Sequence, residues 1–332
     1  MAVNPLLAQP HADADRERIE AELRAAVVAP TPAMTEMAGH LIGAGGKRVR
    51  PLFAVAAGTC VAGHDGPAPL DVVRGGVSVE LVHLGSLYHD DVIDEAVTRR
   101  GIESVNARWG NLRAILAGDF LLAKASEIAA SLGTEVAGLL AATIGRLCEG
   151  EVEELAAAYQ VDRTEDSYLR AIEGKTASLL ATACRIGGIV AGLPRPEIDA
   201  LTEFGRSYGM AFQVVDDVLD VIATDEQLGK PAGLDLREGA YNLPTLRALR
   251  APEGEELRAL LGTPIEGDTW ARARHLVATS RAIDESVAVA HDFVIAANDH
   301  LRDLEDRPSA AALQGAARHL LTSLDEVRAA NA

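Results

Sequence analysis

Four acidic side chains crowd into YHDDVIDEAV, residues 88–97, whose other members are largely apolar. On a helix, Asp90 and Asp94 share one face a turn apart, and Asp91 lies about 100° around the axis. Like charges so close repel one another, and a partly buried cluster has raised pKa values unless a cation compensates. An oxygen-only set of ligands with open positions suits Mg²⁺, which keeps much of its shell for water and phosphate.

A second segment repeats this spacing. FQVVDDVLDVI, residues 212–222, places Asp216, Asp217 and Asp220 inside another apolar stretch. One such segment alone is more typical of a solvated acidic helix face. Two matching segments instead predict two core helices that face each other across a bundle and hold several metal ions between them.

The basic residues point to an anionic ligand. Of 31 basic side chains only four are lysine, at positions 47, 124, 175 and 230, and lysine offers the compact charge that suits a phosphate. Lys47, Lys175 and Lys230 each follow a glycine, which permits close approach of the backbone to a ligand. Arg99 and Arg100 follow the first acidic segment and could flank a metal-bound ligand, although paired arginines at a helix end often only complement the helix dipole.

Composition narrows the class of protein. The formal net charge of −18 argues against nucleic acid or an anionic membrane surface as the general partner. The three cysteines, Cys60, Cys148 and Cys184, are widely spaced in apolar surroundings and indicate reduced residues of a cytoplasmic protein. No segment resembles a signal peptide, and no apolar run reaches the roughly 20 residues that a transmembrane anchor needs.

The elements that must position these residues are helices. Apolar residues recur at helical intervals, and alternating strand-like runs are missing. We expect helices near residues 13–28, 31–43, 48–62, 70–96, 112–131, 134–158, 165–191, 196–223, 241–250, 253–262, 268–281, 284–305 and 309–329. The breaks at 63–69, 192–196 and 225–239 do not resemble flexible linkers. The sequence therefore predicts an all-α fold, with a loose N-terminus over residues 1–12 and a single large helical bundle over 13–332 that has a central cavity between the two Asp-rich helices.

The motifs together resemble a known family. GGKRVRP, HDDVID followed by RRG, Gly118-Asp119, Lys175-Thr176, FQVVDDVLD and GKPAGLDLREG are similar, in order and spacing, to the trans-isoprenyl diphosphate synthases, also called polyprenyl synthetases. The resemblance runs from about residue 40 to 250. It implies an isoprenoid synthase fold, a homodimer, and a prenyltransferase that adds isopentenyl diphosphate to an allylic diphosphate by Mg²⁺-assisted ionisation, condensation and proton loss.

The resemblance also assigns roles by position. It implies three Mg²⁺ ions held by Asp90 and Asp94 on one side and Asp216 on the other. Asp91, Asp217 and Asp220 would support them. The allylic diphosphate would be bound by Arg99, Lys175, Gln213 and Lys230, and isopentenyl diphosphate by Lys47, Arg50, His83 and Arg100. The catalytic set would be Asp90, Asp94, Lys175, Thr176, Gln213, Asp216 and Lys230. Without the resemblance, His83 is more typical of a satisfied core histidine, and Gln213 of a contact between helices.

Product length is expected to depend on the residues before Asp90. Gly85 and Ser86, one turn away, and the deeper Val82 and Val79 are small, so the path stays open for about 16 Å at 1.5 Å per residue. We therefore expect a medium- or long-chain product of roughly six to ten isoprene units. A geranylgeranyl or farnesyl diphosphate synthase is the alternative.

Some features depart from the family pattern or favour other proteins. Ala240 stands where the family often has lysine, and Asn242 where threonine is common, so we expect a weaker or more selective allylic site. A silent regulatory subunit of a heteromeric synthase is the non-enzyme alternative, although both acidic motifs are intact. A metal phosphohydrolase that uses His89-Asp90 would need further histidines and would not explain the second acidic segment.

Overall fold

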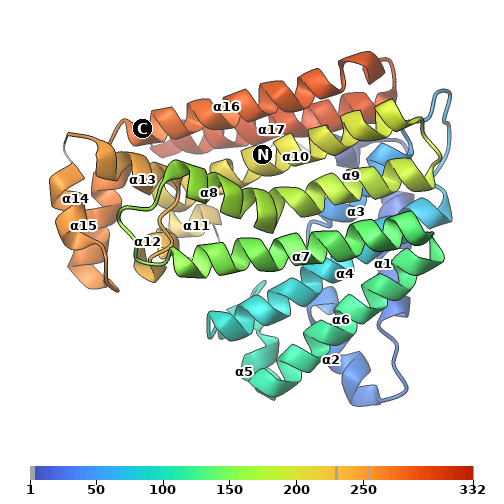
Figure 1. Cartoon of the computed structure of the whole chain (residues 1–332), viewed down its shortest axis with the longest axis horizontal. Helices are drawn as coiled ribbons and strands as arrows, with labels where there is room; N and C mark the ends of the chain where they lie inside the picture. Colours follow the sequence, from blue (N-terminus) through green and yellow to red (C-terminus); the bar gives the residue numbers. More distant parts are fainter. Residues whose placement is uncertain (1–3, 229–230, 253, 332) are drawn as a thin grey trace.

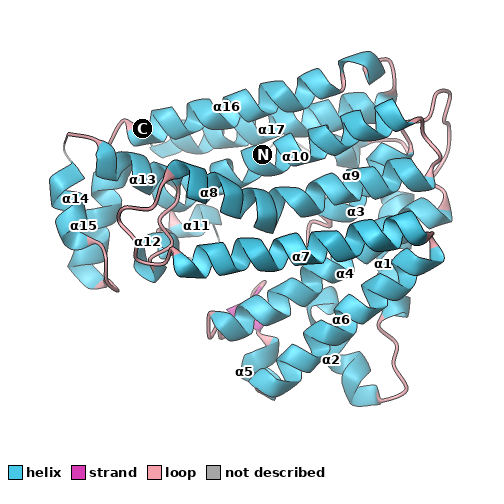
Figure 2. Ribbon diagram, viewed as in Figure 1, coloured by secondary structure: helices cyan, strands magenta, loops and turns pink. Residues whose placement is uncertain are grey.

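The computed structural model describes residues 4–228, 231–252 and 254–331, which fold almost entirely as helices (Figure 2). The α-helices are α1 (Ala12–Ala26), α2 (Pro32–Gly43), α3 (Val49–Gly58), α4 (Leu70–Ile93), α5 (Val105–Trp109), α6 (Asn111–Ser131), α7 (Thr134–Ala156), α8 (Glu165–Ile172), α9 (Ser178–Val190), α10 (Arg195–Ile222), α11 (Asp225–Leu228), α12 (Leu234–Glu238), α13 (Leu243–Arg250), α14 (Gly254–Leu260), α15 (Gly267–Ala278), α16 (Ala282–His300) and α17 (Pro308–Asn331). Shorter elements are η1 (Pro5–Ala8), the π-helical turn η2 (Glu173–Ala177), η3 (Arg302–Leu304) and the strands β1 (Thr98–Arg99) and β2 (Ile102–Glu103). The all-α prediction is confirmed, and the expected helices are present with shifted ends.

Helices α4 and α10 carry the two acidic motifs. Helix α4 packs against α3, α6 and α9, whereas α10 packs against α9, α16 and α17. Each motif occupies the C-terminal end of its helix, and both ends lie toward the same side of the molecule (Figure 1). The bundle therefore brings the two acidic segments to one end of two central helices.

The hydrophobic core has two clusters that α10 connects. One cluster is built from α3, α4, α6 and α9, and the other from the C-terminal half of α10 with α13, α15 and α16. Phe204 and Ala211 of α10 belong to the first cluster, and Val214 and Val218 to the second. Because one helix runs through both, we propose that residues 13–332 fold as a single domain.

Helices α3 and α9 cross at van der Waals distance because glycine lies at the crossing. A Cβ atom added to Gly187 would lie 2.1 Å from the main-chain oxygen of Ala54. At Gly58 it would meet the side chain of Val72 at 2.5 Å and the oxygen of Gly187 at 3.1 Å. Two backbones this close leave no room for a methyl group, so the crossing depends on both glycines.

We expect Gly187→Ala to lower the free energy of unfolding by about 2–3 kcal/mol, because a methyl group forced against backbone cannot be relieved by a side-chain rotation. Gly39→Ala in α2 is the matched control, since its nearest new contact would be at an ordinary 3.9 Å. Helix propensity predicts that this control is neutral or stabilising. Urea unfolding followed by circular dichroism measures both, and equal stability of the two variants would contradict the packing argument.

Two local features differ from expectation. The helix expected over 165–191 contains the π-helical turn η2, a rare insertion that often marks functional sites. The helix expected over 70–96 ends at Ile93, and a hairpin that was not expected follows it at residues 98–103. Strands β1 and β2 pair antiparallel around Arg100 and Gly101, whose φ angles of 54° and 77° are typical of a type I′ turn. Strands this short leave no alternating pattern in a sequence.

The N-terminal segment that we expected to be loose contains the short helix η1. Its Leu6 is buried, and the helix packs against α17 and α1, so apolar contact orders residues ahead of the first long helix. No helix in the described part of the chain is both long and apolar enough to span a lipid bilayer.

Candidate active site

A cavity of about 290 Å³ lies where the ends of α4 and α10 meet α7, α8 and η2. Its lining includes predicted residues from both acidic helices and from η2: Asp94, Lys175, Thr176, Gln213 and Asp217. Other lining residues were not predicted, among them Glu151, Glu154, Arg163, Tyr168 and Asp235. The expected cavity between the two Asp-rich helices is therefore present.

The first acidic motif places negative charge where burial opposes it. Burial raises the pKa of Asp90 to about 7, and the nearby Glu151 and Asp94 add to this effect, against the opposing charge of Lys175. Burial likewise raises the pKa of Asp94. A cation placed between the carboxylates would relieve this strain. Their oxygen donors fit Mg²⁺ by type.

The carboxylates do not make a complete metal site by themselves. Among residues 4–228, 231–252 and 254–331, no group of three or more His, Cys, Asp or Glu side chains converges as a ready-made site. This arrangement agrees with the habit of Mg²⁺, which takes one or two protein carboxylates and fills its octahedral shell with water and substrate phosphates.

Asp91 points away from the cavity. Arg99 Nε donates to Asp91 Oδ1 at 2.6 Å, and Asp91 Oδ2 is buried without a hydrogen-bond partner. The side-chain amide of Asn106 donates to the main-chain oxygen of Asp91 at 2.9 Å. Asp91, predicted to support the metal ions, and Arg99, predicted to bind the allylic diphosphate, thus contact each other. This pair anchors the hairpin to the end of α4.

In the second motif, Asp217 is held by hydrogen bonds to both of its carboxylate oxygens. Tyr168 donates to Oδ2 at 2.5 Å, and Gln213 Nε2 donates to Oδ1 at 2.9 Å. Thr176 Oγ1 in turn donates to Gln213 Oε1 at 2.8 Å. Burial raises the pKa of Asp217, and the hydrogen bonds from Tyr168 and Gln213 oppose that rise. Asp217 therefore orients its neighbours, which agrees with a supporting role.

The other two aspartates of the second motif, Asp216 and Asp220, differ in their exposure to solvent. Asp216 is exposed. Asp220 is buried, and its Oδ2 accepts a hydrogen bond at 3.3 Å from the main-chain nitrogen of Asp235, so it ties α10 to the first turn of α12. Lys230, predicted to bind the allylic diphosphate, lies outside the described residues.

Lys175 is held between two glutamates of α7. Its Nζ lies 2.7 Å from carboxylate oxygens of both Glu151 and Glu154. Burial alone would lower the pKa of Lys175, but these two charges raise it overall, so the side chain stays protonated. The glycine before it serves packing rather than approach to a ligand, because a Cβ on Gly174 would lie 2.9 Å from the main-chain oxygen of Arg146.

Four arginines surround His83, and one of them, Arg99, also acts on Asp90 and Asp94 of the first acidic motif. Burial, followed by the charges of Arg50, Arg100, Arg99 and Arg48, lowers the pKa of His83 well below its usual range, so its ring is neutral. Arg50 Nε is buried without a hydrogen-bond partner. Such a concentration of positive charge favours an anion. Of the residues predicted for isopentenyl diphosphate, Arg50, His83 and Arg100 are brought together, and Lys47 lies exposed on the adjoining loop.

The basic cluster is fixed by its own contacts. Arg48 pairs with Glu20 at 2.6 Å and with the buried Glu80 at 3.3 Å. Arg100 Nη1 donates to the main-chain oxygen of Gly45 at 2.5 Å. Arg48 and Arg100 both have positive φ angles, 47° and 54°, which side chains other than glycine seldom adopt. Such backbone strain is concentrated at functional sites.

The small residues of α4 have a second role that sequence reasoning missed. A Cβ on Gly85 would lie 3.1 Å from the oxygen of Gly118 and 3.2 Å from Leu122, both on α6. Val79 and Val82 are fully buried in the core. Gly85 therefore favours the close packing of α4 on α6, and its small size alone does not indicate an open path. Ser86 remains half-buried one turn before Asp90.

His89 does not reach the cavity. Its Nε2 lies 3.3 Å from the main-chain oxygen of Ile115 and 3.4 Å from a carboxylate oxygen of Asp119, both on α6. The glycine at position 118 leaves room for the ring, since a Cβ there would lie 2.4 Å from His89 Nε2. This orientation gives no support to a phosphohydrolase built on His89-Asp90.

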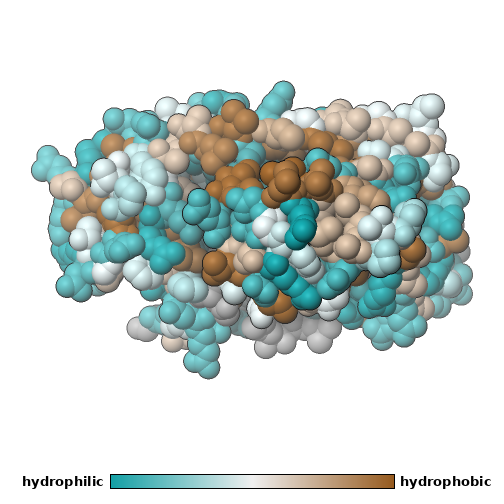
Figure 3. Space-filling model, turned by 90° about the horizontal axis from the view of Figure 1, so that it is seen from below, coloured by the Kyte–Doolittle hydropathy of each residue, from teal (hydrophilic) through white to brown (hydrophobic). Residues whose placement is uncertain are grey.

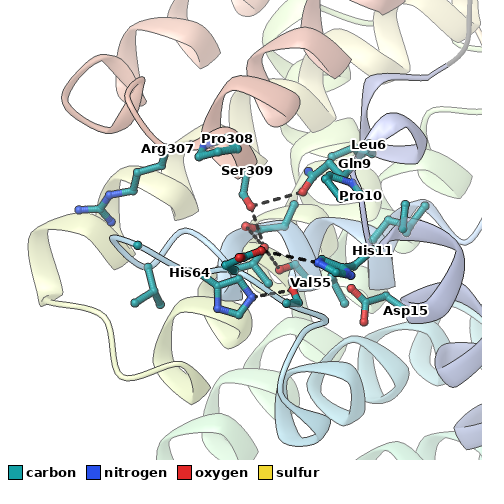
Figure 4. Close-up of a pocket in the computed structure, with 18 of the residues that line it drawn as sticks. Leu6, Gln9, Pro10, His11, Asp15, Val55, His64, Arg307, Pro308 and Ser309 are labelled. Atoms are coloured by element: carbon teal, nitrogen blue, oxygen red, sulfur yellow. Dashed lines mark hydrogen bonds and ion pairs between the residues drawn. The ribbon is translucent and has the colours of Figure 1, made fainter.

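A larger cavity of about 510 Å³ lies between the N-terminal segment, α3 and the start of α17 (Figure 4). Thr59 and Ser309 approach each other there with hydroxyl oxygens 2.8 Å apart. His11 and His64 are among the residues that line it (Figure 4). None of the residues lining this cavity belongs to either acidic motif or to the basic cluster, so size does not mark the site here.

The described structure brings together two carboxylate motifs, a half-buried lysine and a basic cluster, and comparison with known families agrees. The model of the polyprenyl synthetase family matches residues 31–274. The chain belongs to this family. It is accordingly a trans-prenyltransferase of the polyprenyl diphosphate synthase class with the helical isoprenoid synthase fold.

Individual members of the polyprenyl synthetase family are similar over most of the chain. The nonaprenyl diphosphate synthase of Mycobacterium tuberculosis is 39% identical over 84% of this chain and 84% of its own length. Component 2 of the heptaprenyl diphosphate synthase of Geobacillus stearothermophilus is 39% identical over 84% of this chain and 87% of its own. A polyprenyl synthase from Caulobacter crescentus, solved with calcium and isoprenyl diphosphate, superposes with a TM-score of 0.88 at 32% identity, covering 97% and 98% of the two chains.

Proposed function

We propose that this chain extends an allylic diphosphate with isopentenyl diphosphate to a medium- or long-chain all-trans polyprenyl diphosphate, and that it depends on Mg²⁺. The proposal is carried by the cavity in which Asp94 of α4, Asp217 of α10 and Lys175 of η2 meet, together with the cluster of four arginines around His83. One of these arginines, Arg99, acts on Asp94. One region suits a metal-bound diphosphate, and the other suits a second diphosphate.

The acidic end of the cavity would hold the leaving diphosphate. Asp90 and Asp94 from one side and Asp216 from the other are the carboxylates that would hold Mg²⁺, with Asp91, Asp217 and Asp220 as support. The bound metal would supply positive charge to the departing diphosphate, which eases ionisation of the allylic carbon. Lys175 adds charge at the same place. Thr176 and Gln213, linked to each other and to Asp217, would lie beside the reacting carbon.

The basic cluster would hold isopentenyl diphosphate. Arg50 has a buried donor without a partner, and Arg100 and Lys47 flank it. Neutral His83 can donate or accept a hydrogen bond without adding charge. Fixing both diphosphates directs the double bond of one substrate at the allylic carbon of the other, and burial excludes water that would quench a carbocation.

The proposed length of the product is supported more by the similar proteins than by the local geometry of α4. The similar proteins named above are synthases of nonaprenyl and heptaprenyl diphosphate. Ser86, Val82 and Val79 lie along α4 below Asp90 and remain our candidates for the wall of the product path. Geranylgeranyl or farnesyl diphosphate synthesis is the less supported alternative. We also propose a cytoplasmic enzyme, in agreement with its three free cysteines.

A second copy of this chain is the partner that we propose for α6 and α7. These neighbouring helices expose large apolar side chains, namely Leu112, Ile115 and Leu116 of α6 and Val152 of α7. Apolar surface gathers near the middle of one face of the molecule (Figure 3). Apolar patches of this kind usually mark interfaces between proteins.

Leu112→Asp with Leu116→Asp is expected to convert a homodimer to monomers, because two charges would be buried at the interface. Ile295→Asp is the matched control, since Ile295 is 56% exposed on α16, away from these helices. Light scattering after size exclusion reads the mass. A monomeric wild-type chain would contradict the homodimer and leave a heteromeric synthase, as the relative named component 2 illustrates.

The function is tested by incubating the purified chain with Mg²⁺, radiolabelled isopentenyl diphosphate and, separately, each allylic primer. Chromatography of the dephosphorylated products is expected to give a Mg²⁺-dependent ladder ending at one length. A ladder that stops at the farnesyl stage would overturn the proposed product length. No incorporation with any primer would favour the silent subunit.

A further inference from the structure

Arg163 is a buried arginine with donors that the chain does not use. It lies between α7 and α8 and is 7% exposed. Its Nη1 donates to the main-chain oxygen of Tyr241 at 3.3 Å, whereas its Nε and Nη2 are buried and make no hydrogen bond to any described residue. Leaving buried guanidinium donors unpaired is costly, so this arrangement calls for an acceptor from outside the chain.

The position of Arg163 indicates that this acceptor would lie in the candidate active site. Arg163 lines the 290 Å³ cavity together with Ala240 and Asn242. Its Cζ lies 5.7 Å from the ring centroid of Tyr168, the residue whose hydroxyl holds Asp217. The side chain therefore belongs to the wall of the candidate active site.

Arg163 differs from the other cation of this wall. Lys175 is engaged by Glu151 and Glu154, each at 2.7 Å. Arg163 feels the charge of Glu154, yet neither its Nε nor its Nη2 bonds to a carboxylate of the described residues. An arginine keeps its proton even when buried, so it carries its positive charge into the cavity. It can thus accept a new anion without first breaking an ion pair.

We propose that Arg163 is a substrate-binding residue that donates through Nε and Nη2 to a phosphoryl group of the allylic diphosphate. This inference rests on the proposed function. The paired donors of a guanidinium match two phosphate oxygens, and such charge-assisted pairs are the strong ones. Ala240 brings no positive charge to the same cavity, where the family often has a lysine. Arg163 supplies a positive charge there from the segment between α7 and α8. The allylic site is then not deficient in cations, contrary to what Ala240 alone led us to expect.

The first test compares Arg163→Met with Arg163→Lys and with Arg170→Met. Arg170 is the matched control, because it lies on the adjoining α8 and pairs with Glu153 at 3.6 Å, outside the cavity lining. Calorimetry with inorganic pyrophosphate and Mg²⁺ measures binding without turnover. We expect Arg163→Met to bind pyrophosphate about 10- to 100-fold more weakly, Arg163→Lys to be intermediate, and Arg170→Met to match the wild type. Kinetics should show a raised KM for the allylic substrate with the KM for isopentenyl diphosphate unchanged.

The second test separates binding from folding. In Arg163→Met with Ala240→Lys, a charge returns to the cavity from another segment, and we expect it to recover most of the lost pyrophosphate affinity. Wild-type affinity in Arg163→Met would overturn the proposal. So would a loss of affinity that accompanies a lower Tm and that Ala240→Lys does not reverse, since Arg163 would then only support Tyr168 and Tyr241. Failure of the proposed function would appear separately, as absent incorporation by the wild-type chain.

Discussion

Asp90→Asn is expected to lower kcat by about 10³-fold and, in metal-free buffer, to raise the Tm of the protein. The loss of rate follows from removing one of the carboxylates that would hold positive charge against the departing diphosphate. The gain in stability follows from burial, which raises the pKa of Asp90 to about 7 and so penalises its charged form. A lower kcat together with a higher Tm is the result expected for a residue that serves function at the expense of stability.

The sign of the pH dependence is determined by the raised pKa. In the unfolded chain Asp90 titrates near the ordinary value of about 4, and in the folded protein at about 7. Its protonated form favours the fold, so the stability that it contributes is complete below the unfolded pKa and is lost as pH rises through the folded one. The Tm difference between Asp90→Asn and the wild type should therefore widen from pH 5 to pH 8.

Mg²⁺ with pyrophosphate provides the decisive comparison. A ligand that binds only the folded state raises Tm by mass action, so the wild type should gain and Asp90→Asn should gain much less. Glu127→Gln is the control, because Glu127 is exposed on α6 and pairs with Lys124 at 2.8 Å, and it should keep both activity and the response to ligand. An Asp90→Asn enzyme with wild-type kcat would remove Asp90 from the catalytic set.

The predictable parts of the site are residues whose type conflicts with their setting. Asp90 is half-buried and Asp217 is buried, each in an apolar helix where an acid is costly without a purpose, and the conflict is visible in the sequence. Tyr168 gives no such signal, because a tyrosine at an apolar helical position is typical of a core residue. Only the fold brings its hydroxyl to Asp217, 49 positions away in the chain.

The other features that the sequence did not predict also have physical causes. Glu151 and Glu154 belong to the run EGEVEEL, which is typical of a solvated acidic face, and the tight crossing of α7 with η2 turns them onto Lys175. A small residue can serve an open path or a close helix contact. The sequence does not separate these causes at Gly85, whose contact with Gly118 decides for packing. The π-helical turn has no sequence signature at all, yet it positions both Lys175 and Thr176.

Arg50→Met is expected to raise the KM for isopentenyl diphosphate about 100-fold with a smaller effect on the KM for the allylic substrate, because truncating one member of a buried charged contact is costly. Burial raises the pKa of Glu80, and Arg50 is the cation that opposes this rise most strongly. Loss of Arg50 therefore also leaves the buried Glu80 carboxylate with less neighbouring positive charge. A fall in Tm therefore accompanies the fall in affinity, and the single variant cannot separate them.

The double variant Arg50→Met with Glu80→Gln separates them. Burial raises the pKa of Glu80 and makes its charge unfavourable, so neutralising it should recover much of the lost Tm. It returns no cation to the site, so the KM for isopentenyl diphosphate should stay high. Arg74→Met is the control, since Arg74 pairs with Glu22 at 3.0 Å elsewhere on α4 and should leave both KM values unchanged. If the double variant regained the wild-type KM, Arg50 would act by holding the fold around Glu80, and the anion at this cluster would be bound by Lys47 and Arg100 without it.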